Sequence, residues 1–118
     1  MKTYTKAELI EEFDELREVV LKKGIKVVND GKKTFYKELL IREATTKDQI
    51  NCGNDVRAKK NDMAMSAILV SLVTFKKIGD DQYTKVTLPE VETIKLKDSS
   101  IIADVISDFD AEIGKDLD

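Results

Sequence analysis

The sequence has no histidine and only one cysteine, Cys52. Histidine is the commonest general base and the commonest transition-metal ligand in proteins, so its absence removes the usual means of hydrolytic and metal-dependent chemistry. A lone cysteine cannot form an intrachain disulfide, and zinc would have to be held by carboxylates and one thiol, which suits its ligand preferences poorly. We therefore expect no enzymatic activity, no metal and no cofactor.

Glycine clusters and long apolar runs are also missing. The five glycines are isolated from one another, whereas phosphate-binding loops need several glycines between a strand and a helix. No apolar run approaches the ~20 residues that span a bilayer. The first residues have no apolar stretch typical of a secretory signal. These absences predict a protein of the cytoplasm with no membrane partner.

Charge of neither sign dominates the chain. It carries 20 basic and 23 acidic residues, for a net charge of −3. A nucleic-acid-binding protein carries a basic excess gathered on one face, so we expect no nucleic-acid partner. The 118 residues are 42% hydrophobic, which predicts a single domain, residues 1–118, with one hydrophobic core.

The N-terminal segment predicts a helix over residues 5–23. Thr5 and Glu8 have the spacing of a capping box, in which each side chain bonds the other's backbone N–H. Gly24 offers a left-handed end to the helix. Apolar residues recur at spacings of three and four along this segment, as on one face of a helix: Leu9, Ile10, Phe13, Leu16 and Val20.

A β-hairpin is predicted next, over residues 25–42. Asn29, Asp30 and Gly31 are a strong turn signal, because each tolerates a positive φ more cheaply than most residues do. Strand-forming residues stand on both sides of this turn. A two-stranded hairpin alone is only marginally stable, so it must lie on helices or pair with another chain.

The rest of the chain predicts helices. A helical core is expected over residues 46–78, in which Met63 to Ile78 is the most apolar stretch and must be covered on several sides. A C-terminal helix capped by Asp98 is expected over residues 98–112. The predicted fold class is α+β and mostly helical, with four to five helices and one β-hairpin near the N-terminal third.

A short motif follows the predicted hairpin and resembles one in the tail assembly chaperones of Mu-like bacteriophages and related families. In those proteins a hairpin leads into an apolar residue, then Arg-Glu-Pro-Thr, two variable residues and Asp. Ala44 stands here in place of the usual proline. The resemblance covers roughly residues 24 to 110. The motif positions in this chain are Ile41, Arg42, Glu43, Thr45 and Asp48.

The resemblance implies a function in phage tail assembly. Chaperones of this kind bind the tape measure protein, a very long and aggregation-prone helical chain, and keep it soluble while the tail tube assembles around it. The implied partner is therefore the tape measure protein, and the implied location is the cytoplasm of the bacterial host. Chaperone genes in this setting are often extended by a programmed frameshift into a longer form.

A binding surface for such a partner can come from the apolar stripes of the first and last predicted helices. The alternative is that both stripes close the core of the monomer, and self-association is a further use of the same surface. The candidate partner-binding residues are Ile10, Phe13, Leu16, Val20, Ile102, Val105, Ile106 and Phe109.

Two other functions compete with a chaperone. The chain could be a structural subunit of a phage particle, of the head–tail joining or tail-terminator type, which forms rings of fixed size. It could also be a small regulatory protein, and one that binds nucleic acid requires its lysine clusters to gather on one side.

Overall fold

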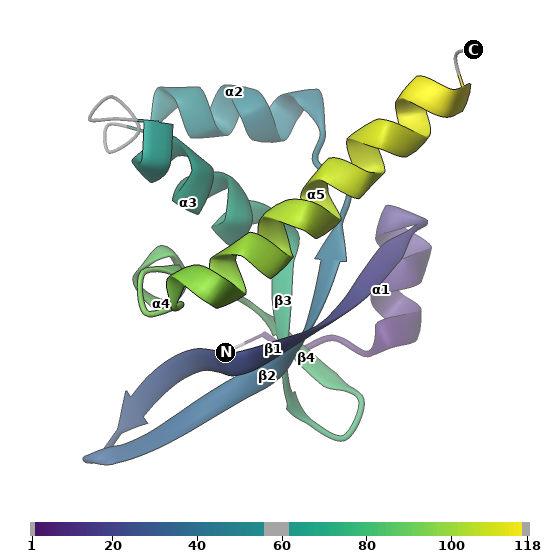
Figure 1. Cartoon of the computed structure of the whole chain (residues 1–118). Coiled ribbons are helices and arrows are strands. Elements are labelled where there is room, and N and C mark those ends of the chain that lie inside the picture. Colours follow the sequence, from purple (N-terminus) through teal and green to yellow (C-terminus); the bar gives the residue numbers. More distant parts are fainter. Residues whose placement is uncertain (1, 56–61, 117–118) are drawn as a thin grey trace.

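A computed structural model describes residues 2–55 and 62–116 of the chain (Figure 1). After the first helix, the elements in these residues come in pairs of one kind: two strands, two helices, two strands and two helices. In chain order, the elements are α1 (Lys6–Phe13), β1 (Leu16–Asn29), β2 (Lys32–Arg42), α2 (Thr46–Asn54), α3 (Asp62–Val73), β3 (Thr74–Gly79), β4 (Gln82–Lys85), α4 (Leu88–Val91) and α5 (Leu96–Asp116).

The four strands form one antiparallel sheet in the order β1-β2-β3-β4. The predicted mostly helical fold with one hairpin is therefore wrong: the described part of the chain is α+β with a four-stranded sheet and five helices. The hairpin between β1 and β2, with its turn at Asn29 to Gly31, is confirmed. It is longer than predicted and is stabilised by the pairing of β2 with β3.

Helices lie on both faces of this sheet. Leu39 and Ile41 of β2 point toward α3, α4 and α5 and join the larger core, which includes Ile102 of α5. Leu40, between them in sequence, points to the other face and packs with Leu9 of α1. This is the alternation expected of a strand covered on both sides. In the described residues no helix has the length and apolar character needed to cross a bilayer.

The predicted helix over residues 5–23 is wrong beyond Phe13. Its start is correct, because Thr5 and Glu8 form the expected capping box. The helix ends at Asp14, which has a positive φ of 64°. From Leu16 onward burial alternates instead of following a helical period, with Val19 buried and Val20 exposed. Pairing with β2 makes this segment a strand. The sequence alone does not distinguish the two structures, since an apolar spacing of three or four is compatible with both a helix and a strand over a few residues.

Gly24 marks an irregularity in β1 rather than the end of a helix. The register of β1 on β2 shifts between Val20 and Ile25, which is a β-bulge. Gly24 has a φ of +94°, and a Cβ atom there would lie 2.7 Å from the carbonyl oxygen of Tyr36. Both features require glycine at this position.

We expect Gly24→Ala to lower the free energy of unfolding by about 1–3 kcal/mol, since it adds backbone strain and a backbone clash. Gly53 of α2 is the matched control, because nothing lies within 4 Å of its Cβ position. Gly53→Ala should leave stability unchanged or raise it by up to about 1 kcal/mol through helix propensity. Urea unfolding followed by circular dichroism measures both, and equal effects of the two substitutions would contradict this account of Gly24.

The predicted helical core over residues 46–78 is also too long. α3 ends at Val73, and the chain continues directly into β3, where Thr74, Phe75 and Lys76 pair with β2. Lys76 interrupts the apolar sequence, but it is buried and forms an ion pair with Glu90 of α4. β3 then turns back into β4, and the two strands form a short antiparallel hairpin.

The C-terminal helix is longer than the predicted 98–112, and Asp98 is not its cap. α5 begins at Leu96, so Asp98 lies in its first turn. The Asp98 carboxylate is fully buried and accepts backbone N–H bonds from Lys22, Lys23 and Gly24, at 2.8, 2.9 and 3.0 Å. It therefore fastens the start of α5 to the bulge of β1.

Candidate partner-binding groove

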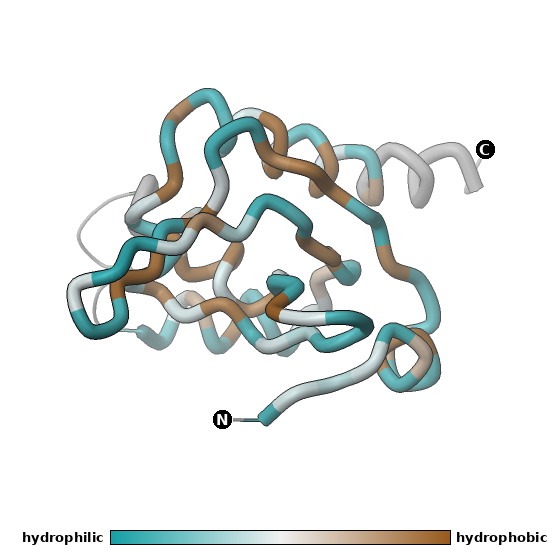
Figure 2. Tube along the Cα trace, turned by 90° about the horizontal axis from the view of Figure 1, so that it is seen from below, coloured by the Kyte–Doolittle hydropathy of each residue, from teal (hydrophilic) through white to brown (hydrophobic). Residues whose placement is uncertain are grey.

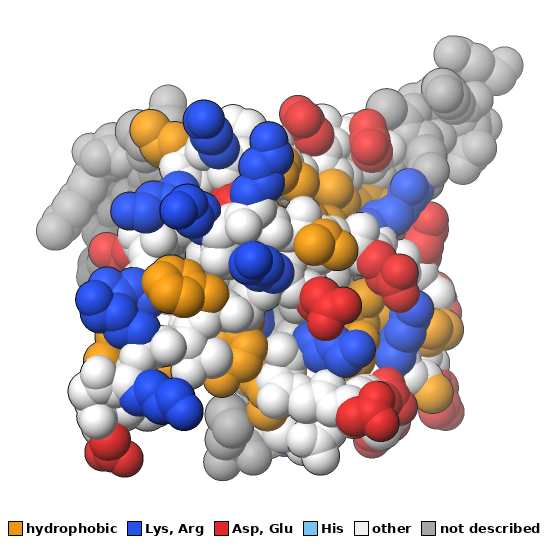
Figure 3. All heavy atoms as spheres, turned by 60° about the horizontal axis from the view of Figure 1, so that its bottom comes forward, with side chains coloured by type: hydrophobic (Ala, Val, Ile, Leu, Met, Phe, Trp, Pro, Cys, Tyr) orange, Lys and Arg blue, Asp and Glu red, His pale blue; other side chains and the backbone are white. Residues whose placement is uncertain are grey.

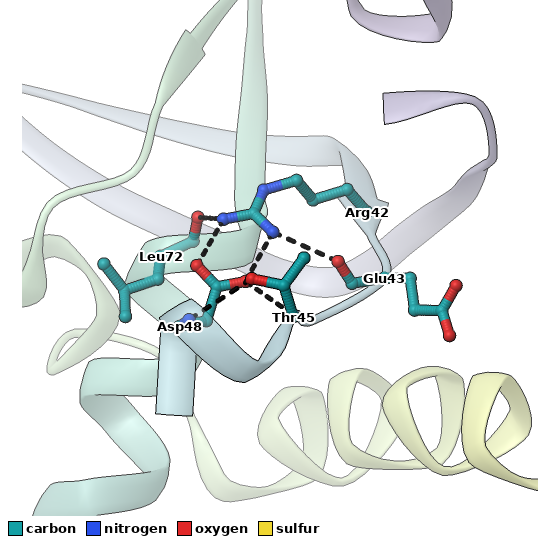
Figure 4. Close-up of polar contacts among 5 residues, drawn as sticks. All are labelled: Arg42, Glu43, Thr45, Asp48 and Leu72. Atoms are coloured by element: carbon teal, nitrogen blue, oxygen red, sulfur yellow. Dashed lines mark hydrogen bonds and ion pairs between the residues drawn. The ribbon is translucent and has the colours of Figure 1, made fainter. Parts of the chain in front are cut away.

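The motif residues form a buried polar cluster where β2 meets α2 (Figure 4). The Arg42 guanidinium donates two hydrogen bonds to the Asp48 carboxylate, from Nη1 to Oδ2 at 2.7 Å and from Nη2 to Oδ1 at 2.8 Å. Nη2 also donates to the carbonyl oxygen of Leu72 at 2.9 Å. Each of the two charged side chains is only 9% exposed. A two-pronged ion pair of this kind sets the angle between the groups as well as their distance.

Thr45 completes the cluster as the N-cap of α2. Its hydroxyl accepts from the backbone N–H of Asp48, and its own backbone N–H donates to Asp48 Oδ2 at 2.7 Å. The Arg42 guanidinium, together with the Thr45 donors, holds the pKa of Asp48 well below its usual range despite burial. Asp48 is therefore ionised whenever the protein is folded near neutral pH.

The remaining motif residues have other surroundings. Ile41 is fully buried in the larger core. Glu43 contributes its backbone carbonyl to Arg42, at 3.1 Å, while its side chain points away from the cluster (Figure 4). The motif thus joins the end of β2 to the start of α2 and the end of α3. Its hydrogen bond to Leu72 holds the end of α3, where the chain enters β3, beside the end of β2.

An apolar groove of about 580 Å³ runs between α3 and α5, closed at one end by α4 and the turn after it. Its volume is in the usual range of the clefts in which proteins bind small ligands. Of the described residues that line it, Glu92 alone is charged. The aliphatic side chains along it come from three parts of the chain: Ala67, Leu69 and Val70 of α3, Val91, Ile94 and Leu96 around α4, and Ile102, Ala103 and Ile106 of α5.

The groove exists because α3 is apolar on nearly all sides and the fold covers only some of them. Ile68 and Val73 are buried, while Leu69 and Val70 stay half-buried beside the groove. Leu96, at the first turn of α5, is 78% exposed. A helix this apolar needs cover on several sides, so the open side presents surface that a partner can shield.

The structure divides the predicted partner-binding residues into three groups. Ile102 and Ile106 line the groove, and Ile102 lies at its floor because it is also buried in the core. Phe109 is buried and Val105 is packed against the core. Both residues therefore belong to the core of the monomer, which was the alternative to partner binding. The residues of the first predicted helix are on the opposite face of the sheet: Ile10, Phe13, Leu16 and Val20.

The four residues of the first predicted helix do not form one stripe. Phe13 packs on Phe75, with ring centroids 5.9 Å apart, and lies under the Arg42 guanidinium. Leu16 is half-buried beside the smaller core. Ile10 is 43% exposed on α1, and Val20 is 67% exposed on β1. The first and last predicted helices therefore do not build a common surface.

Sequence reasoning missed the α3 side of the groove. Leu69, Val70 and Ala67 were assigned to the interior because the whole stretch is apolar. The signal that could have identified them is the large number of apolar residues in this stretch. A chain of this size has few other elements with which to cover every side of such a helix. Leu96 and Ile94 gave no periodic signal, because they flank a helix start.

Comparison of the chain with protein-family models, with curated proteins and with solved structures finds no match in any of the three.

Proposed function

We propose that this protein is a tail assembly chaperone of a phage or prophage, which binds the tape measure protein and keeps it soluble during tail assembly. Two features support the proposal. The motif that resembles those chaperones forms a buried cluster at a hairpin-to-helix junction, and the apolar groove between α3 and α5 suits an apolar helical partner.

The groove is the observation that carries the proposal. Tape measure chains are long helices with apolar stripes. A groove binds such a helix through apolar side chains of the helix that are spaced by three, four and seven residues. The aliphatic walls of α3 and α5 can shield such a stripe, and Glu92, which alone is charged among the described lining residues, imposes little demand for a charged partner group. The charged exterior of the chaperone then keeps the complex dispersed.

The proposed activity involves no chemical reaction. The chaperone acts in the cytoplasm of the host by covering the apolar surface of the tape measure protein, without a cofactor or a nucleic acid. It is expected to be encoded directly upstream of a long coiled-coil protein, and that protein is the partner to test.

Co-expression with that coiled-coil protein tests the function. We expect the fraction of the partner in the soluble extract to rise several-fold when the chaperone is present. Ala103→Glu should abolish this gain, because it places a charge in the groove from an exposed position of α5. Burying an unpaired carboxylate against aliphatic walls is strongly unfavourable.

Ser100→Glu is the matched control. Ser100 is exposed on the same helix, does not line the groove, and receives the same change of charge. It should support solubility as well as the unaltered chain does. A partner that stays insoluble with the unaltered chain, or equal behaviour of the two variants, would count against the groove as the binding site.

A further inference from the structure

The end of the β1–β2 hairpin forms a basic arm, defined here as residues 26–37. Its tip projects past the helices at one end of the molecule, whereas α1 lies at the other end, and the two views in Figures 1 and 2 agree on this. The molecule measures 50 Å along its longest axis. The arm therefore does not reach the α1 helix of its own chain.

One face of the arm combines lysines with exposed apolar side chains. Lys26 stands opposite Phe35, and Val28 opposite Lys33, so these four residues share one face of the two strands. Phe35 is 50% exposed and Val28 is 54% exposed. The other face, with Val27 and Tyr36, packs against the larger core. The basic face is thus the uncovered side of the sheet.

The lysines of the arm have no ion-pair partner in the part of the chain that the structure describes. The arm holds Lys26, Lys32, Lys33 and Lys37 against the single acid Asp30, a net charge of +3. Figure 3 shows lysine side chains gathered on the side of the arm, and acidic side chains concentrated toward the side of α1.

The surface of α1 is the electrostatic complement of the arm. Lys6 and Arg17 pair with Glu18 and Glu15 beside it. Glu8, Glu11, Glu12 and Asp14 remain, all exposed, and no ion pair among the described residues engages them. Their charge of −4 is opposite to the arm's excess of +3, and exposed Ile10 lies among them as a partner for Phe35.

We propose that the basic arm of one copy docks on the α1 surface of a second copy. The contact joins two different surfaces, so a pair of copies keeps one free arm and one free α1 surface, and association continues head to tail into rings or short chains. A second copy is favoured over a nucleic acid as the occupant because the chain carries a complement of opposite charge and its net charge of −3 repels polyanions.

Sedimentation velocity of the purified full chain tests this contact. At low salt the average mass should rise with protein concentration, and at high salt it should return to the monomer, since salt screens exposed charges beyond a few ångströms. Phe35→Ser should also weaken association, because it removes the apolar centre of the contact.

Charge reversal sharpens the test. Lys32→Glu/Lys33→Glu reverses the arm, and Glu11→Lys/Glu12→Lys reverses α1. Each pair alone should weaken self-association by at least about tenfold, since like charges then face each other. Mixing the two variants should restore association in which the two alternate, because the unaltered arm of one meets the unaltered α1 of the other and the two reversed surfaces are also opposite in charge. Lys95→Glu/Lys97→Glu changes the net charge equally at exposed positions outside both surfaces, and should leave association unchanged.

Four results would overturn the proposal. They are a monomer at every concentration in low salt, association that neither reversal weakens, a ring of fixed mass that resists high salt, and a protein that stays monomeric but binds a single-stranded oligonucleotide through the arm. Circular dichroism of each variant shows whether it is folded, and all substituted positions except the face residue Phe35 lie on polar, exposed sites. None of these measurements involves the tape measure protein, so they succeed or fail independently of the proposed function.

Discussion

Asp48→Ala is expected to lower the free energy of unfolding by about 3–5 kcal/mol, because it leaves the buried Arg42 guanidinium without its partner. The same substitution removes the carboxylate that accepts from the Thr45 backbone N–H, so the start of α2 frays as well. Urea unfolding followed by circular dichroism measures the loss.

A double-variant cycle separates the ion pair from the other effects. Arg42→Ala/Asp48→Ala should cost less than the sum of the two single substitutions, since the second no longer strands a buried charge. Glu18→Ala is the control, because its ion pair with Lys6 is exposed and should have little effect on stability. An Asp48→Ala loss no greater than that of the control would contradict the role given to the cluster.

The same ion pair predicts a dependence on pH. The pKa of Asp48 is lower in the folded protein than in the unfolded chain, chiefly because of Arg42. Its contribution to stability is therefore complete above the unfolded pKa of about 4, and is lost as the pH falls toward the folded value. The unaltered protein should lose more stability between neutral pH and pH about 3 than Asp48→Ala does.

Asp98→Ala should destabilise the protein by about 3 kcal/mol or more, because three backbone N–H groups of the β1 bulge lose their acceptor together. Burial alone raises the pKa of Asp98, but the donors from Gly24, Lys22 and Lys23 outweigh it and hold the pKa below its usual value. The carboxylate is therefore charged, and hydrogen bonds to a charged acceptor are the stronger kind.

Two further variants test this interpretation. Asp98→Asn keeps one acceptor oxygen but turns an amide N–H toward a backbone donor, so its loss should be smaller than that of Asp98→Ala and still measurable. Asp104→Ala removes an exposed acid from the same helix and should change stability by less than about 0.5 kcal/mol. If Asp98→Ala behaved like Asp104→Ala, Asp98 would not fasten α5 to β1.

The signals that predicted local structure correctly all act over two or three residues. Thr5 and Glu8 form the expected capping box, and the predicted turn at Asn29 to Gly31 joins two strands. These features need no distant partner, because a side chain bonds to a backbone group one turn away or a residue tolerates a rare φ. The helix cap and the turn could therefore be predicted from the sequence without knowledge of the fold.

Of the residues that line the groove between α3 and α5, only part was predicted. Ile102 and Ile106 were named from the apolar stripe of the last helix, and both line the groove. Phe109 belongs to the same stripe but is buried, since a period of 3.6 residues identifies the apolar face of a helix and does not say which of its residues the rest of the chain covers. The α3 wall of the groove could not be separated from core for the same reason.

The local sequence was enough to specify where the hairpin turns and where α1 and α2 begin, because those choices depend on neighbours along the chain. Contacts between distant segments decided the rest. Leu16 to Gly24 became strand rather than helix through pairing with β2, and Thr74 to Gly79 did so through the same neighbour. Asp98 became a clamp on β1 rather than a helix cap because its acceptor oxygens meet N–H groups more than seventy residues away. A strand is completed only by the backbone beside it, and that neighbour is specified by the whole fold.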